Sequence, residues 1–274
     1  MEAFVKLFQR SKTIIIGMIH VKSLPGTPLY KCGMVDIIDK ACTEAEVYKN
    51  ADIDGIMLEN MLDIPYLHSK DVGPEIVASM AVVMNEVKKV FNKKPIGIQI
   101  LAGANEAALA VCKATGADFI RAEGFIFSHV ADEGLMNACA GSLLRYRRQL
   151  DADDILVFSD IKKKHSSHSI TEDIDIVETA KAAEFFLSDG VILTGTATGS
   201  PADQSELEAV KKAVNIPVLV GSGVTCENLA DFVEANAIIV GSHFKDVGHW
   251  KNDLDIHRVV SFMEKAKKLR SAGN

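Results

Sequence analysis

Short apolar runs alternate with longer stretches of helical periodicity along the whole chain. Each run spans four to six residues, favours a strand by its composition, and is followed by turn residues. Consecutive runs start about 20 to 42 residues apart, which is room for one strand and one returning helix. The eight predicted strands are 14–19, 55–58, 96–101, 118–121, 155–158, 190–193, 217–220 and 237–240.

The segments between and after these runs are predicted to be helices. Pro74 suits the first turn of one helix, and Gly116 suits the end of another because glycine tolerates a positive φ. Strands that are apolar on both faces and alternate with helices predict a parallel sheet covered by helices. The eight predicted helices are 35–49, 74–90, 105–114, 135–150, 174–186, 203–214, 227–234 and 254–269.

Eight such units predict an α/β fold, a (β/α)8 TIM barrel in which 1–274 forms a single domain with 1–12 as an N-terminal extension. A doubly wound open sheet is the alternative. It is less favoured because no G-x-G-x-x-G pattern follows the first strand and no change of composition divides the chain. Four apolar side chains of the extension are expected to pack across the barrel bottom or onto a neighbouring molecule: Phe4, Val5, Leu7 and Phe8.

Composition excludes several classes of protein. The chain has 274 residues, is 48% hydrophobic and carries a formal net charge of −7. An acidic balance argues against a surface for phosphate backbones, so no nucleic-acid partner is expected. No apolar run approaches the roughly 20 residues of a membrane span. The five cysteines include no C-x-x-C pair, which argues against a disulfide or zinc framework.

The first residues bear on the location of the protein. The first strong apolar run begins by Thr13, which leaves little room for a removable targeting peptide, so a cytoplasmic protein is expected. The basic residues Lys6, Arg10 and Lys12 keep an organellar destination as the alternative. Barrels of this size often pair through their outer helices, so a homo-oligomer is expected.

The active site of such a barrel is expected at the carboxyl ends of the strands. Asp160 and Glu59 are the candidate acid and base, and His20, Arg121 and Lys162 are expected to orient the substrate or stabilise an oxyanion. This pairing of acid and base is typical of an isomerase or a lyase. The candidate substrate-binding residues are Asn60, Gln99, Glu123, His165, Thr194, Thr196 and Thr198.

The lysine-rich segment after the fifth strand allows more than one interpretation. Lys162 or Lys163 is a candidate Schiff-base amine if its pKa is lowered. For Lys163 and Lys164 a solvated basic loop is favoured. Arg121 and Glu123 are two residues apart and would point to the same face of a strand, where a purely structural ion pair is the alternative to a functional role.

The last two predicted strands end in small residues. Gly221, Ser222 and Gly223 follow the seventh strand, and Gly241 and Ser242 follow the eighth. Glycines let an anion approach the backbone, and the start of the next helix adds favourable charge. These loops predict a phosphate site and a phosphorylated small-molecule ligand; a tight turn that merely needs glycine is the alternative.

Two cofactors remain as alternatives. The residue types for a divalent metal are present, but no spacing such as H-E-x-x-H fixes a site, so no metal ligand is assigned. The same two glycine-serine loops would hold the phosphate of FMN, which makes an FMN-dependent barrel enzyme an alternative function. The residues considered for a metal are His20, Glu59, Asp160, His165 and His168.

Four segments match a known pattern in order and spacing: GMIHVKSLPGTP at 17–28, LEN at 58–60, FIR at 119–121 and DIKKKH at 160–165. In these segments the chain resembles the BtpA family, and its glycine-serine loops are similar to those of the wider ribulose-phosphate-binding barrel superfamily. The resemblance implies a TIM barrel with a phosphorylated ligand. Because the family takes its name from photosystem I accumulation, it also implies a non-catalytic assembly or regulatory factor as an alternative.

The resemblance to the family does not identify the substrate of this chain. Where many family members have Asn-x-Leu-x-Asn, this chain has QILAG at 99–103, and Glu123 stands where another Asn is expected. These departures indicate a distinct subgroup. The expected function is therefore an enzyme of isomerase or lyase type that acts on a small phosphorylated sugar, sugar acid or nucleoside-like metabolite.

Overall fold

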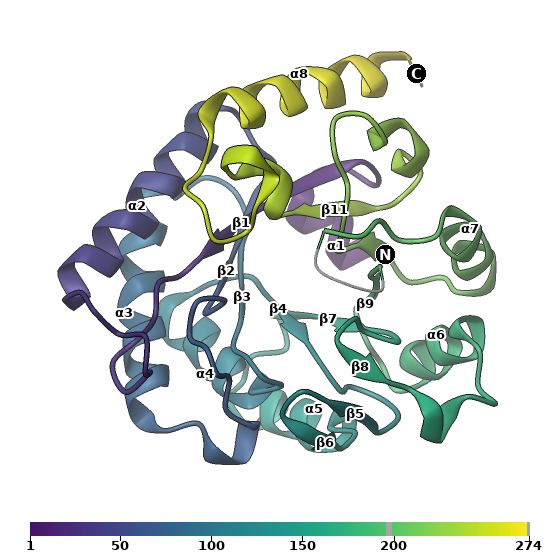
Figure 1. Cartoon of the computed structure of the whole chain (residues 1–274). Helices are drawn as coiled ribbons and strands as arrows, with labels where there is room; N and C mark the ends of the chain where they lie inside the picture. The colour runs from purple at the N-terminus through teal and green to yellow at the C-terminus, as the bar shows by residue number, and fades with distance from the viewer. Residues whose placement is uncertain (196–198, 273–274) are drawn as a thin grey trace.

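Eight parallel strands close into a barrel in the computed structural model, which describes residues 1–195 and 199–272 (Figure 1). Their order around the barrel is β1-β11-β10-β9-β7-β4-β3-β2. Their bounds are β1 (Ile14–His20), β2 (Gly55–Glu59), β3 (Ile96–Gln99), β4 (Phe119–Ala122), β7 (Leu156–Asp160), β9 (Gly190–Leu193), β10 (Val218–Val220) and β11 (Ala237–Val240). The predicted (β/α)8 barrel is confirmed.

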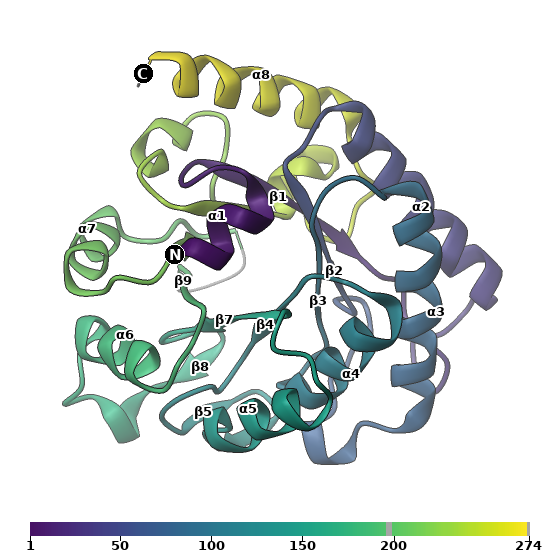
Figure 2. The same ribbon diagram turned by 180° about the vertical axis from the view of Figure 1, so that it is seen from behind.

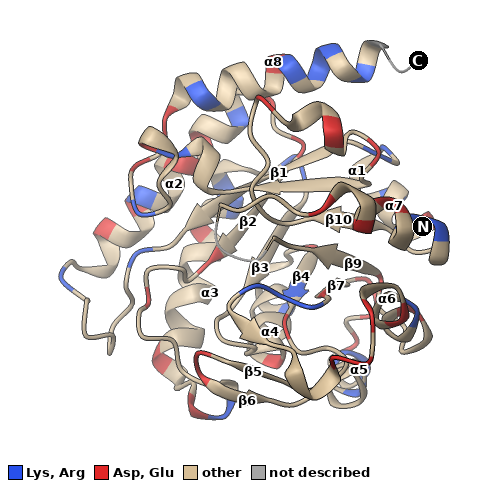
Figure 3. Cartoon of the chain, turned by 45° about the vertical axis from the view of Figure 1, so that its right-hand side comes forward, with Lys and Arg blue, Asp and Glu red and all other residues tan. Residues whose placement is uncertain are grey.

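Helices surround the barrel on all sides (Figures 1 and 2). They are α2 (Met34–Asn50), α3 (Pro74–Val90), α4 (Asn105–Thr115), α5 (Ala140–Gln149), α6 (Ile176–Phe185), α7 (Gln204–Ala213) and α8 (Ile256–Ala272). Acidic and basic residues both occur along these outer helices (Figure 3), as expected of faces in contact with water. Short 3-10 helices lie in the loops: η1 (Ser69–Asp71), η2 (Ser169–Thr171), η3 (Leu229–Phe232), η4 (Ser242–Phe244) and η5 (Asp246–Gly248).

Close packing between β1 and α2 requires a glycine in the first strand. A Cβ on Gly17 would lie 2.7 Å from the ring of Tyr48. The hydroxyl of this buried tyrosine donates to the carbonyl oxygen of Met18 at 2.8 Å. The contact fixes the helix against the strand whose last residue, His20, reaches the carboxyl end of the barrel.

The amino end of the barrel is closed by the short helix α1 (Glu2–Phe8), which lies over this end in Figure 2. The ring of Phe4 lies 5.9 Å from that of Phe158, and the ring of Phe8 lies 5.8 Å from that of Phe119. Such contacts combine apolar burial with favourable ring geometry. The expected packing across the barrel bottom is therefore confirmed for Phe4, Leu7 and Phe8, whereas Val5 is exposed. The cavity described below lies at the opposite end.

The predicted helix 135–150 is wrong over its first residues. Gly134, with a φ of 107°, forms a turn that only glycine adopts readily, and the chain continues as a strand. This strand, β6 (Gly134–Met136), pairs with β5 (His129–Ala131), and Val130 lies opposite Leu135. A third strand, β8 (Ser166–Ser167), completes a small antiparallel sheet beside the barrel.

The predicted helix 227–234 is replaced by the four-residue 3-10 helix η3. The side chain of Asn228 accepts a hydrogen bond from the backbone of Thr225 and donates one to the carbonyl oxygen of Gly223. This local turn uses the residues in which a longer helix would begin. The carboxyl end of β10 is consequently followed by a compact loop rather than by a full helix.

Candidate active site

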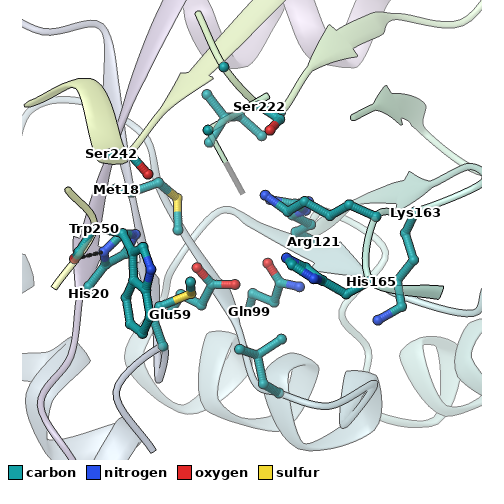
Figure 4. A pocket seen from close by; sticks show the side chains of 18 of the residues that line it. Met18, His20, Glu59, Gln99, Arg121, Lys163, His165, Ser222, Ser242 and Trp250 are labelled. Carbon is teal, nitrogen blue, oxygen red and sulfur yellow. Dashed lines mark hydrogen bonds between the residues drawn. The ribbon is translucent and has the colours of Figure 1, made fainter. Parts of the chain in front are cut away.

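A cavity of about 570 Å³ lies at the carboxyl end of the barrel (Figure 4). Its polar wall consists of His20, Glu59, Gln99, Arg121 and Asp160, which come from five strands. The strand register explains the convergence, since His20 lies beside Glu59 and Glu59 lies beside Gln99. The sequence predicted all five, and the structure brings them together.

Two buried ion pairs lie in this wall. The guanidinium of Arg121 donates three hydrogen bonds of 2.9 to 3.1 Å to the carboxylate of Asp160. The ammonium of Lys163 lies 3.1 Å from Oε1 of Glu123. The alternative of an Arg121–Glu123 pair is therefore wrong, because Glu123 lies past the end of β4 and is bound by Lys163 and by the backbone N–H of Gly103.

Glu59 and Asp160 differ in how their charge is balanced. Burial raises the pKa of both carboxyl groups above the usual range. Asp160 is held by Arg121, whereas no described residue donates a hydrogen bond to the carboxylate of Glu59, which faces the cavity. A carboxylate whose environment favours the protonated form, and which is open to a ligand, suits a general acid or base.

The loop after β7 turns back over the barrel instead of extending into solvent. The backbone φ is positive at Lys162 and at His165, and the backbone N–H of Lys164 donates to Oγ1 of Thr194 at 3.1 Å. The interpretation of Lys163 as a solvated lysine is consequently wrong, and Lys164 is partly buried. Lys163 is 8% exposed, and burial and the charge of Arg121 lower the pKa of Lys164 to about 8.

His20 is held as a neutral imidazole. Its pKa is lowered to about 3, mainly by burial and in addition by the positive charge of Lys245. Its Nδ1 lies 3.0 Å from the carbonyl oxygen of Trp250, which accepts a hydrogen bond from a protonated Nδ1 (Figure 4, dashed line). In this tautomer Nε2 is left as an acceptor. The positive charge of Lys245 is itself balanced by a buried pair with Glu44 at 2.7 Å.

The two glycine-serine loops border the same cavity as the charged groups. A Cβ on Gly221 would lie 3.6 Å from Nη2 of Arg121, and a Cβ on Gly241 would lie 3.1 Å from Nε2 of His20. Gly223 has a φ of 65°, and a Cβ there would collide with the backbone of Ser200. The alternative of a turn that needs glycine therefore applies to Gly223. A Cβ on Gly221 would also lie 2.7 Å from the side chain of Ile192, so packing alone requires glycine there, and Gly241 allows close approach to His20.

Several predicted residues lie elsewhere or have a structural partner. Asn60 is buried and its Oδ1 accepts from the backbone of Leu101 at 2.8 Å. Thr194 holds the backbone of Lys164, as described above. The ammonium of Lys162 donates to the carbonyl oxygen of Thr171 at 3.1 Å and lines a separate cavity of about 20 Å³. Two predicted residues lie outside the residues that the structure describes: Thr196 and Thr198.

Two further predicted residues line the main cavity. His165 comes from the loop after β7 (Figure 4). Gln99 is 2% exposed, and its Oε1 is buried without a hydrogen-bond partner among the described residues. An unsatisfied buried acceptor is costly in a folded protein, so Gln99 favours a ligand that donates a hydrogen bond.

Sequence reasoning missed an apolar wall of the cavity. Met61, Ile64, Tyr66 and Trp250 line it from loops that follow β2 and β11. Their sequence neighbourhoods lack the glycine and charge patterns that mark the other residues. The only available signal was that Trp250 is the single tryptophan of the chain and lies past a strand end.

Within 1–195 and 199–272, no three His, Cys, Asp or Glu side chains are grouped as ligands for a metal ion. Across these same residues, no helix combines the length and the apolar character needed to cross a membrane.

Comparison with known proteins gives a family for nearly the whole chain. The BtpA family model matches residues 10–268. A Caenorhabditis elegans protein named uncharacterized and mitochondrial is 50% identical over 269 residues, which cover 97% of each chain. The photosystem I biogenesis protein BtpA of Synechocystis sp. is 33% identical over 94% of this chain and 90% of its own. For this chain, a cytoplasmic location and its organellar alternative both stay predictions.

Solved structures with similar folds are distant in sequence. Orotidine 5′-monophosphate decarboxylase of Methanocaldococcus jannaschii superposes with a TM-score of 0.58 at 15% identity, covering 93% of this chain and 99% of its own. Thiamine phosphate pyrophosphorylase of Pyrococcus furiosus has a TM-score of 0.57 at 10% identity, covering 95% and 98%. At these identities the likeness establishes the barrel fold alone.

Proposed function

The chain belongs to the BtpA family, and we propose that it is an enzyme of isomerase or lyase type that acts on a small phosphorylated metabolite. One observation carries the proposal: two glycine-serine loops border the same cavity as a carboxylate to which no described residue donates a hydrogen bond, and as a buried arginine-aspartate pair. A scaffold without a ligand has no use for buried charges at the open end of its barrel, because burying them is unfavourable.

The phosphate is assigned to the loops after β10 and β11. Gly221, Ser222 and Ser242 line the cavity there, and the guanidinium of Arg121 lies beside Gly221. Phosphate sites of TIM barrels frequently occupy the loops after the last two strands. By analogy of fold, the two barrels above whose names include a phosphorylated compound support a phosphorylated ligand.

Glu59 is the proposed acid and base of the reaction. Its raised pKa favours proton uptake, and no described residue competes for its oxygens. Arg121, fixed by Asp160, is suited to stabilise an oxyanion that develops when a proton is removed beside a carbonyl. Asp160 thereby becomes a residue that positions Arg121. The neutral His20 accepts a hydrogen bond from the substrate through Nε2.

The apolar wall favours a metabolite with a second, less polar part. Trp250 lies across the cavity from Arg121 and Lys163 (Figure 4), Met61 and Tyr66 line the same cavity, and a phosphate alone fills a small part of about 570 Å³. Among the expected substrate classes, this arrangement favours a nucleoside-like metabolite, whose planar ring would contact the aromatic side chains.

A matched pair of variants at Ser242 tests the phosphate assignment. Asp and Asn have nearly the same shape, so Ser242→Asp adds a negative charge beside the proposed phosphate and Ser242→Asn does not. Thermal unfolding with a panel of phosphorylated sugars and nucleotides is expected to identify a stabilising ligand, since a ligand at 100 times its Kd adds about 2.7 kcal/mol.

The stabilisation should disappear in Ser242→Asp and persist in Ser242→Asn. Equal stabilisation of both variants would place the phosphate elsewhere. If no phosphorylated compound stabilises the wild-type protein, and a protein partner is isolated with it instead, the assembly-factor alternative is favoured.

A further inference from the structure

Three consecutive lysines after β7 have three different environments. Lys162 donates to Thr171 in the smaller cavity, and Lys163 is paired with Glu123. Lys164 lines the main cavity, and its ammonium makes no hydrogen bond or ion pair with any described residue. A partly buried amine that no described residue pairs with directly is unfavourable when charged, so its position in the cavity favours a ligand or a reaction.

The electrostatic influence of Lys164 extends across the barrel mouth. Its charge lowers the pKa of His20 and of Glu59, which come from β1 and β2. These strands lie across the barrel from β7, after which Lys164 follows. Lys164 therefore lines the same cavity as the proposed phosphate loops and the proposed base, and its charge acts on that base.

The protonation state of Lys164 suits a nucleophile. Burial and the neighbouring Arg121 lower its pKa to about 8, although Glu59 and Asp160 act in the opposite direction. Roughly a tenth of such an amine is neutral at pH 7, against less than roughly a thousandth of an ordinary lysine. A neutral amine has the lone pair that attack on a carbonyl carbon requires.

We propose that Nζ of Lys164 forms an imine with a carbonyl carbon of the phosphorylated substrate. The lone pair of the amine forms the N–C bond, the nitrogen loses its two protons, and the carbonyl oxygen takes them up and leaves as water. A proton from solvent then adds to the imine nitrogen, and the protonated imine accepts the electron pair of an adjacent C–H bond, whose proton goes to the carboxylate of Glu59. For an adjacent C–C bond to a hydroxyl-bearing carbon, that carbon leaves as an aldehyde and Glu59 takes its hydroxyl proton. Reprotonation of carbon and hydrolysis by water regenerate the amine.

This inference rests on the proposed function, because it names the group that reacts with the bound metabolite. It also changes the assignment within the lysine segment. The sequence pointed to Lys162 or Lys163 as a Schiff-base amine, whereas both have protein partners that hold their ammonium groups.

The test uses pyridoxal 5′-phosphate as a probe, since it combines an aldehyde, a planar ring and a phosphate. The purified protein is incubated with one equivalent of the probe, and cyanoborohydride reduces any imine to a stable secondary amine. Peptide mass spectrometry then locates the label. We expect at least tenfold more label on Lys164 than on Lys162 or Lys163, with a labelling rate that rises with pH around a midpoint near 8.

Two variants serve as matched controls. Lys164→Arg keeps the positive charge but forms no imine, so the preferential label should disappear. Lys163→Arg keeps the pair with Glu123, so the label on Lys164 should remain. Pyridoxine 5′-phosphate has an alcohol in place of the aldehyde. It should bind the wild-type protein and both variants, as measured by its fluorescence, and it should compete with labelling.

The outcomes separate the inference from the function on which it rests. Uniform labelling of lysines, or no label on Lys164 although pyridoxine 5′-phosphate binds, would overturn the imine and leave the phosphate site standing. If unphosphorylated pyridoxal labels Lys164 as fast as the phosphorylated probe does and pyridoxine 5′-phosphate does not bind, the amine is supported and the phosphate site fails.

Discussion

The two ends of the barrel are built from the same strands but differ in the chemistry of their inward-facing side chains. On β7 the inward-facing Phe158 is followed two residues later by Asp160, and on β4 Phe119 is followed two residues later by Arg121. Successive side chains of a strand alternate between its faces, so each pair points into the barrel at different heights. The amino end is apolar and closed by α1, and the carboxyl end is charged and open.

On each of these strands, a residue that stabilises the fold is therefore followed two residues later by a residue that lines the cavity. At the amino end, each aromatic ring removed from water stabilises the fold by about 1.5 to 3 kcal/mol. At the carboxyl end, burial is unfavourable for each charge and is offset only where a partner is present, as it is for Arg121 and Asp160. Glu59 and Lys164 form no hydrogen-bonded ion pair within the described residues and are therefore the groups whose positions are best explained by a ligand.

The largest expected effect is that of Phe158→Ala. The ring contacts Phe119 and Phe4 at centroid distances of 5.4 and 5.9 Å, and its removal leaves a void that the closed end cannot fill. We expect a loss of about 4 kcal/mol in the free energy of unfolding, measured by urea denaturation. Binding of pyridoxine 5′-phosphate to the folded variant should remain. Loss of binding in parallel with stability would show that the two ends are not independent.

A smaller effect is expected for Asp160→Asn. Asparagine keeps the shape of the side chain but leaves the buried guanidinium of Arg121 without its countercharge, which costs about 2 kcal/mol in the free energy of unfolding. The double variant Arg121→Gln/Asp160→Asn should lose less free energy of unfolding than the two single variants lose together, because it removes both charges. Strict additivity in this double-mutant cycle would contradict the paired role assigned to the two residues.

The comparison also explains which features the sequence revealed. All eight barrel strands were predicted because both of their faces are buried, and the candidate residues His20, Glu59 and Asp160 were found because strand register brings the last residues together. These are consequences of local periodicity and of the closed topology. The packing of the N-terminal segment was predicted from its apolar residues, but its helical conformation was not.

The features that the sequence did not reveal depend on loop conformation. The sequence does not distinguish the three lysines at 162–164. Their different environments follow from positive φ angles in the loop and from the hydrogen bond to the side chain of Thr194. Trp250 reaches the cavity from a loop beyond η5, where no periodicity guides a prediction. Long-range contacts of this kind are decided by tertiary packing.

The smallest expected effect has the opposite sign. Glu59→Gln keeps the shape of a buried group but removes its charge. The pKa of Glu59 is raised in the folded protein, so the folded state binds a proton more tightly than the unfolded chain. The wild-type protein therefore loses stability as the pH rises above the ordinary pKa of glutamate, about 4.3, through the higher pKa of the folded state.

At pH 7 we expect Glu59→Gln to be more stable than the wild-type protein by about 1 kcal/mol, a gain typical of removing a strained functional group. The difference should vanish near pH 4, where the carboxyl group is protonated in the folded state. Urea denaturation of both proteins at the two pH values measures it. A loss of stability at pH 7 would mean that the carboxylate is held by the protein rather than kept for a ligand, and the contrast between Glu59 and the paired Asp160 would no longer stand.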